Sequence, residues 1–190
     1  EEAMLAANVC SANFIALSKH PGLYRVHEGP TPEKVEILQA YLKANGLGVS
    51  IGDAPSPGEF QAIAQATKDR PDAQQIHSML LRSMQQAIYT PANSGHFGLA
   101  YSAYTHFTSP IRRYPDLLVH RVIKSILAKA RYQLPALPKP GEAHAKLARR
   151  LEKGNMLKAG QTPQAPRKAN AEGMAWQAAG LHCSANERRA

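Results

Sequence analysis

Two adjacent arginines stand between two prolines in the segment 104-YTHFTSPIRRYPDLLVHR-121, where they are numbered Arg112 and Arg113. The first proline follows Ser109, and a serine before a proline is typical of a helix N-cap and first helical position. The second proline, Pro115, lacks the N–H that a continuous helix needs, and its ring would clash with the carbonyl four residues earlier. The spacing therefore predicts one turn, a kink, and a fresh helix that begins at Pro115.

The turn predicted at 110–114 and the helix after it place two helix starts back to back. Free backbone N–H groups and the positive ends of helix dipoles gather at such starts. Guanidinium groups add bidentate donors that match phosphate oxygens. We therefore interpret Arg112 and Arg113 as a candidate phosphate site. The alternative is that both arginines pair with carboxylates elsewhere or face solvent.

The charge distribution also favours a polyanion as partner. The chain has 190 residues and a net charge of +9, and residues 1–100 carry 7 basic and 9 acidic side chains. Residues 101–190 carry 16 basic and 5 acidic side chains. A nearly neutral half joined to a strongly basic half predicts a local surface for a polyanion, although a basic solubilising surface has the same composition. The length fits one domain with a hydrophobic core, or one and a half small ones.

The cysteines and the lengths of the apolar runs indicate the cellular compartment in which the protein is expected. Cys10 and Cys183 lie at opposite ends of the chain without CxxC spacing, which favours a reducing compartment and leaves a disulfide open. The longest apolar runs are far shorter than the ~20 residues of a membrane span. We therefore expect a cytoplasmic protein with no membrane partner.

The positions of proline and glycine along the sequence predict a helix-rich chain with a minority of strand. The first helix is expected to bury an apolar face at spacings of three and four, formed by Ala3, Ala7, Cys10, Phe14 and Leu17. The further expected elements are a strand at 23–28, helices at 32–45, at 57–68, from Pro71 and at 115–129, and an extended segment at 96–107.

Two S-x-x-E patterns predict helix starts, one at 56-SPGE-59 and one at 184-SANE-187. The second pattern lies close to the last residue, and the first helix has no residue before it to cap it. We therefore expect that both termini interrupt helices and that the chain is a piece of a larger protein.

Six blocks of the sequence resemble, in the same order, the ribonuclease II/R family of 3′→5′ exoribonucleases. The blocks are 1-EEAMLAAN-8, 25-RVHEGP-30, 69-DRPDAQQIHSMLLRSMQQAIY-89, 95-GHFGLAYSAYTHF-107, 106-HFTSPIRRYPDLLVHR-121 and 181-LHCSANERRA-190. The resemblance implies a helix-rich α+β fold that is part of an RNB-type catalytic domain. The C-terminal part of that domain is expected at 1–130, a Pro/Lys-rich insertion or linker at 131–175, and the truncated start of the last RNB helix at 176–190.

The resemblance also implies an activity, a cofactor and partners. Members of this family processively hydrolyse single-stranded RNA to nucleoside 5′-monophosphates, with Mg²⁺ held by clustered aspartates, as in two-metal displacement. The only aspartates of this chain are Asp53, Asp69, Asp72 and Asp116, and no set has the short spacing of a Mg²⁺ site. We therefore expect the metal ligands outside this chain and no activity from the chain alone. The expected partners are single-stranded RNA and the rest of the enzyme, namely the N-terminal RNB half with cold-shock and S1 OB-fold domains.

At the matching positions, the resemblance implies that Arg112 is catalytic and contacts the phosphate at the reacting end. Arg113 is expected either in a structural ion pair or on a neighbouring phosphate. The remaining RNA-binding candidates are Glu1, Glu2, Asn8, Ser109 and Tyr104. For the two glutamates, the alternative is that they are ordinary first-turn acids of a helix.

Aromatic and histidine side chains around this segment have a second interpretation as core. The possible base-stacking residues are Tyr101, Tyr104, Phe107 and Tyr114, of which we expect at most one or two to contact RNA. We interpret His106, His120 and Trp176 as structural.

A run of basic residues in the expected linker supports an alternative function. These residues are Lys139, Lys146, Arg149, Arg150, Lys153, Lys158, Arg167 and Lys168. They favour a non-catalytic RNA-binding or assembly module that retains the RNB fold, although a solvated loop has the same pattern.

Overall fold

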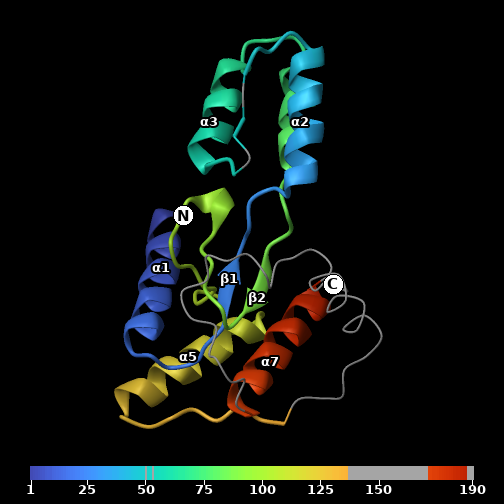
Figure 1. Cartoon of the computed structure of the whole chain (residues 1–190). Helices are drawn as coiled ribbons and strands as arrows, with labels where there is room; N and C mark the ends of the chain where they lie inside the picture. Colours follow the sequence, from blue (N-terminus) through green and yellow to red (C-terminus); the bar gives the residue numbers. More distant parts are fainter. Residues whose placement is uncertain (50, 53, 137–170, 188–190) are drawn as a thin grey trace. The chain divides into compact units, whose positions relative to one another are not determined.

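A computed structural model describes residues 1–49, 51–52, 54–136 and 171–187. These residues form two compact units (Figure 1). Unit 1 comprises Glu1–Val26, Ala87–His96 and the described residues from Tyr101 onward, and unit 2 comprises His27–Gln86 and Phe97–Ala100. Each unit has a hydrophobic core of its own.

Unit 1 joins a two-stranded ribbon to three helices. Its elements are α1 (Glu2–Leu17), β1 (Tyr24–Val26), β2 (Ile88–Thr90), α5 (Tyr114–Leu127) and α7 (Ala171–Glu187). The strands are antiparallel, with Arg25 opposite Tyr89. In Figure 1, α1 and α7 flank this ribbon. The helix-rich α+β prediction is confirmed.

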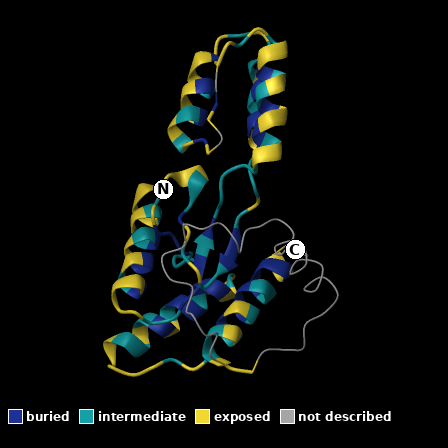
Figure 2. Ribbon diagram, viewed as in Figure 1, coloured by how far each residue is buried: buried dark blue, intermediate teal, exposed yellow. Residues whose placement is uncertain are grey.

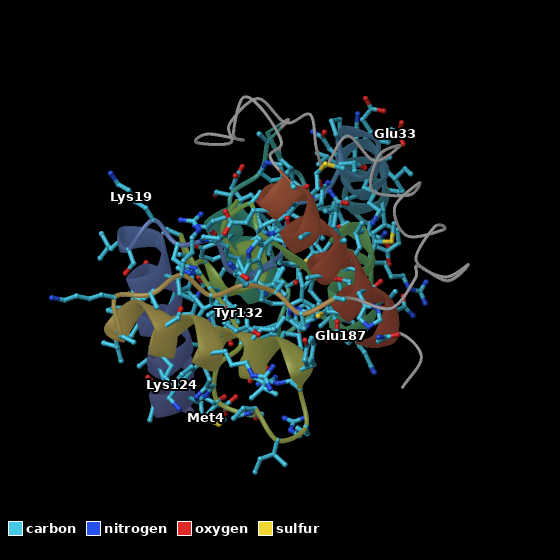
Figure 3. All side chains as sticks on the ribbon, turned by 90° about the horizontal axis from the view of Figure 1, so that it is seen from below. Met4, Lys19, Glu33, Lys124, Tyr132 and Glu187 are labelled. Atoms are coloured by element: carbon cyan, nitrogen blue, oxygen red, sulfur yellow. The ribbon has the colours of Figure 1, made fainter. Side chains whose placement is uncertain are left out.

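The core of unit 1 draws on every one of these elements. Ile15, Val26, Leu118 and Trp176, from α1, β1, α5 and α7 respectively, are almost completely buried. Figure 2 shows the buried parts of these elements in dark blue. The ring of Tyr132, labelled in Figure 3, lies with its centroid 6.4 Å from that of Trp176. The interpretation of the tryptophan as a packing residue is confirmed.

Helix α7 approaches β2 very closely. A Cβ placed on Gly180 would lie 2.5 Å from the carbonyl oxygen of Tyr89, so only glycine allows this contact. One turn later, the Ser184 hydroxyl accepts a hydrogen bond from the Tyr89 amide at 2.8 Å and donates to the Gly180 carbonyl at 2.9 Å. The predicted helix start at 184–187 is therefore wrong, because Ser184 lies inside α7 and its hydroxyl joins the helix to the strand.

Replacing Gly180 with alanine should lower the free energy of unfolding by about 1–3 kcal/mol. The added methyl group must displace a backbone carbonyl, and this outweighs the helix preference of alanine, which is at most about 1 kcal/mol. Urea unfolding measures the difference. Gly48→Ala is the matched control, because a Cβ there meets open space. Equal stabilities of the two variants would contradict the close approach.

The predicted apolar face of α1 is wrong. Of its five residues only Ala7 and Phe14 are half-buried, and Leu17 is 83% exposed. Small and apolar residues occur on several sides of this helix, so spacing alone did not identify the packed side. The residues that are actually buried are Asn8, Ser11, Ala12 and Ile15.

Unit 2 is a small helical unit. It contains α2 (Pro32–Ala44), α3 (Pro57–Ala66), α4 (Ala73–Ser83) and the 3₁₀ helix η1 (Phe97–Leu99). Its core consists of Val35, Leu38, Leu42, Ile51, Phe60, Ile63, Ile76 and Leu80. The capping box at Ser56–Glu59 is confirmed. The extended segment predicted at 96–107 is interrupted by η1, where a short helical turn packs Phe97 edge-on against Phe60 at 5.4 Å.

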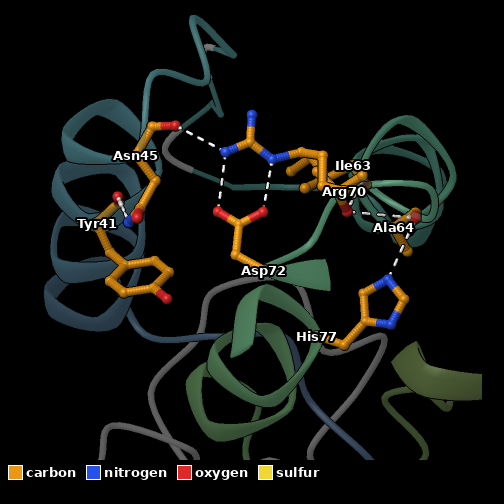
Figure 4. A network of polar contacts seen from close by, with 8 residues as sticks. Tyr41, Asn45, Ile63, Ala64, Arg70, Asp72 and His77 are labelled. Carbon is orange, nitrogen blue, oxygen red and sulfur yellow. Dashed lines mark hydrogen bonds and ion pairs between the residues drawn. The ribbon is translucent and has the colours of Figure 1, made fainter. Parts of the chain in front are cut away.

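A polar network fixes the start of α4 in unit 2 (Figure 4). Arg70 donates to both carboxylate oxygens of Asp72 at 2.8 Å and to the Asn45 carbonyl at 3.1 Å. The hydrogen bonds from Arg70 lower the pKa of Asp72. Because these two residues form a turn, the helix begins at Ala73 rather than at Pro71 as predicted. None of the helices in the described part of the chain is long and apolar enough to cross a membrane.

Candidate functional site

The turn that carries the two arginines has the predicted form. The amides of Arg112 and Arg113 both donate to the Ser109 carbonyl, at 3.3 and 3.0 Å. Helix α5 then begins at Tyr114, one residue before the predicted start, with Arg113 at the N-cap position. The interrupted helix start is confirmed.

A buried carboxylate lies behind this turn. The Asp116 side chain is fully buried, and its Oδ2 accepts hydrogen bonds from the Ser109 amide at 2.8 Å and from Nη2 of Arg113 at 2.9 Å. Asp116 therefore connects the residue before the turn to the residue after it.

The two arginines have different environments. Arg113 is engaged by Asp116, and its side chain is 24% exposed. Arg112 is exposed, and its side chain makes no hydrogen bond or ion pair with the residues that the structure describes. A guanidinium that no carboxylate neutralises is available to a ligand anion. Arg113 therefore forms the structural ion pair that was one of its two expected roles, and its contact with a neighbouring phosphate stays a prediction.

A third arginine, Arg25 on β1, was not singled out from the sequence. Its guanidinium lies 4.6 Å from the centroid of the Tyr89 ring and pairs with Oε2 of Glu187 at 2.6 Å. Glu187 stands at the C-terminal end of α7 (Figure 3). The strand register, with Arg25 opposite Tyr89, and the hydrogen bond from the Arg25 amide to the Tyr104 carbonyl at 2.8 Å link Arg25 to this site, and neither is visible in residue spacing.

The pKa of His106 is affected by burial and by these arginines. Its Nδ1 shares a 2.8 Å hydrogen bond with the Tyr89 hydroxyl. Burial, followed by the positive charges of Arg113, Arg25 and Arg112, lowers the pKa of His106 to about 3. Burial also raises the pKa of Tyr89. Both groups are therefore neutral near pH 7.

The depressed pKa of His106 predicts a stability change on the acid side. Between about pH 6.5 and pH 3 the unfolded chain binds a proton at this histidine that the folded chain does not, so stability falls as the pH falls through that window. His106→Gln should make the loss of unfolding free energy between pH 7 and pH 5 smaller than in the wild type. Denaturant unfolding at both pH values measures this, with His182→Gln as control. An unchanged pH slope in the His106 variant would contradict the neutral histidine.

Asn8 and Tyr104, both RNA-binding candidates, meet each other in the interior of unit 1. Nδ2 of Asn8 donates to the Tyr104 hydroxyl at 2.9 Å, and Oδ1 accepts from the Phe107 amide at 2.9 Å. Both side chains are at most 5% exposed. The structure therefore assigns them a packing role, which the sequence offered as an alternative for Tyr104 but did not indicate for Asn8, and their RNA contact stays a prediction.

The remaining candidates lie at the exposed surface or in the turn. Glu1 and Glu2 are exposed at the start of α1, and Glu1 makes no side-chain capping bond. Ser109 holds the turn through its backbone. Among the aromatic candidates, Tyr101 stacks on Tyr104 with centroids 5.9 Å apart, whereas Tyr114 is 38% exposed.

His120 is structural, as interpreted. Its ring stacks on Phe107 with centroids 4.1 Å apart, and its Nε2 lies 2.8 Å from the Phe107 carbonyl oxygen. Within the described residues, no group of three or more His, Cys, Asp or Glu side chains is arranged to hold a metal ion. The basic residues at 139–168 lie outside the described residues.

The sequence and fold of this chain are similar to those of one family of known proteins. The RNB domain model matches residues 1–129. The chain belongs to the RNB domain family. Ribonuclease R of Escherichia coli strain K12 is 44% identical over 154 residues, which cover 81% of this chain and 19% of that protein. This RNB chain therefore spans about a fifth of the length of that relative.

Two solved structures resemble this RNB chain. The apo form of Mycoplasma genitalium RNase R has a TM-score of 0.61 and 32% identity, covering 64% of this chain and 19% of that one. Yeast Ssd1, described as a pseudonuclease, has a TM-score of 0.61 and 25% identity, covering 70% of this chain and 17% of that one.

Proposed function

We propose that the protein carrying this chain is a 3′→5′ exoribonuclease, which processively hydrolyses single-stranded RNA to nucleoside 5′-monophosphates. The observation that carries the proposal is the exposed Arg112, without a carboxylate partner among the described residues, on a turn that resembles the family signature. Membership in the RNB domain family and identity with ribonuclease R support it.

In this proposal, Arg112 donates to a non-bridging oxygen of the phosphate at the reacting end. Charge increases on that phosphate as water attacks, and a fixed guanidinium stabilises the transition state more than the ground state. The neighbouring positive charges of Arg113 and Arg25 raise the local potential for an anionic substrate, although each is paired with a carboxylate. Glu1 and Glu2 are proposed to contact the ribose near the 3′ end, where a carboxylate accepts from a 2′-hydroxyl.

The proposed cofactor is Mg²⁺. The described residues do not form a site that could hold this ion. Mg²⁺ prefers several oxygen ligands in octahedral geometry, whereas Asp116 and Asp72 each pair with an arginine. We therefore propose that the metal ligands come from outside this chain, and that the chain alone does not cut RNA. The other proposed partners are the N-terminal RNB half and OB-fold domains of the same enzyme.

A non-catalytic RNA-binding module is the second candidate. It is favoured by the likeness to yeast Ssd1, which is described as a pseudonuclease. Such a protein would bind RNA through the same arginines and leave it intact.

Incubation of the full-length protein with 5′-labelled single-stranded RNA distinguishes the two functions. The exonuclease proposal expects shortened products in the presence of Mg²⁺ and none after chelation of the metal. RNA that is bound but not shortened under the same conditions would establish the module instead.

A further inference from the structure

The ion pair between Arg113 and Asp116 is poorly suited to stabilising the fold. It is made end-on through a single pair of atoms, Nη2 and Oδ2. Nε of Arg113 and Oδ1 of Asp116 are both buried and have no hydrogen-bond partner in the described part of the chain. Burying charged groups with unmet hydrogen bonds offsets most of the attraction between them, so such a pair gives little net stability.

The same pair is well suited to fixing a geometry. Oδ2 of Asp116 is shared between the Ser109 amide and the Arg113 side chain, and the Ser109 carbonyl accepts from the amides of Arg112 and Arg113. These bonds define the two ends of the turn. Arg112 is the residue between them whose side chain they leave exposed and unpaired with the described residues.

We propose that Asp116 is a positioning residue that holds Arg113 inside the fold and thereby sets the direction of Arg112 toward the RNA phosphate. This inference rests on the proposed function. Asp116 touches neither substrate nor metal in this account, and it acts only through the backbone at Ser109 and through Arg113. Asparagine at this position keeps the shape and an acceptor oxygen and removes the charge that retains the guanidinium.

A double-mutant cycle in the full-length protein tests the coupling. Asp116→Asn should lower the single-turnover rate of RNA hydrolysis at least about 10-fold, because small misplacements of a catalytic group have large effects on rate. RNA affinity should change less than about 3-fold. In the Arg112→Ala background the same substitution should lower the rate by less than about 2-fold, because the group that Asp116 positions is absent.

Two outcomes of the cycle would overturn the proposal. The first is an equal fold-loss in both backgrounds, which is the behaviour of a residue that only supports folding. The second is an equal loss of rate from Glu172→Gln, which alters a more exposed ion pair elsewhere in unit 1, that of Glu172 with Arg131 at 2.6 Å.

Hydrogen exchange separates failure of this inference from failure of the proposed function. Asp116→Asn should accelerate amide exchange at least about 10-fold in peptides covering 107–114 and leave α7 unchanged. If the wild-type protein has no ribonuclease activity but the variant shows this local acceleration, the proposed function is refuted. The inference that Asp116 positions the turn would then still hold. Unchanged exchange at 107–114 would refute the positioning itself, whatever the activity.

Discussion

Arg112→Ala should lower the turnover number of RNA hydrolysis by the full-length protein about 100-fold, while the dissociation constant for RNA changes by less than about 3-fold. The expectation follows from the size of effect seen when one donor to a charged transition state is removed. Arg112 is exposed and its side chain makes no polar contact with the described residues, so removing that side chain should leave the fold unchanged. Single-turnover kinetics and equilibrium binding, measured on the same preparations, separate the two effects.

The matched control for Arg112→Ala is Lys124→Ala, which removes one exposed positive charge from α5. It should leave the turnover number within about 2-fold of the wild type, because a distant surface charge acts through the screened potential alone. Equal losses of rate and affinity in Arg112→Ala would mean that the arginine contributes uniform binding rather than transition-state stabilisation.

Trp176→Ala should lower the free energy of unfolding by about 3–5 kcal/mol, the range for truncating a buried aromatic residue. The side chain is 1% exposed and belongs to the core shared by α1, the ribbon, α5 and α7. Its loss leaves a cavity in a core to which α1, both strands, α5 and α7 contribute, so the effect should extend to the whole of unit 1. Circular dichroism during chemical unfolding measures it, since the variant has no tryptophan fluorescence.

Met174→Ala is the control for Trp176→Ala, because Met174 lies on the same helix and is 60% exposed. It should change the unfolding free energy by no more than about 0.5 kcal/mol. A similar loss from both substitutions would mean that α7 itself, rather than the tryptophan, determines the stability of this core.

The arginine-bearing turn was predictable from sequence because its causes are local. Pro110 and Pro115 restrict their own backbone and that of their neighbours, so the interrupted helix start follows from a few residues. The capping box at Ser56–Glu59 is local in the same sense. Most of the helices were predicted for this reason.

The surroundings of the turn were not predictable, because they depend on contacts between distant segments. Arg25 reaches the site through pairing of β1 with β2, more than sixty positions later in the chain. Ser184 has the sequence pattern of a helix start, yet tertiary packing against Tyr89 places it inside α7. The buried face of α1 was missed because small and apolar residues occur on several sides of the helix, and contacts with distant segments, such as that of Asn8 with Tyr104, decide which side is packed.

The most direct test of the central claim uses single-stranded RNA with different labels on its 5′ and 3′ terminal nucleotides. With Mg²⁺ and the full-length protein, the 3′ label should appear as a nucleoside 5′-monophosphate in the first turnover, while the 5′ label stays in a steadily shortening strand. Arg112→Ala should give the same products about 100-fold more slowly. Release of the 5′ label first, internal cleavage, or bound RNA with both labels intact would contradict the account.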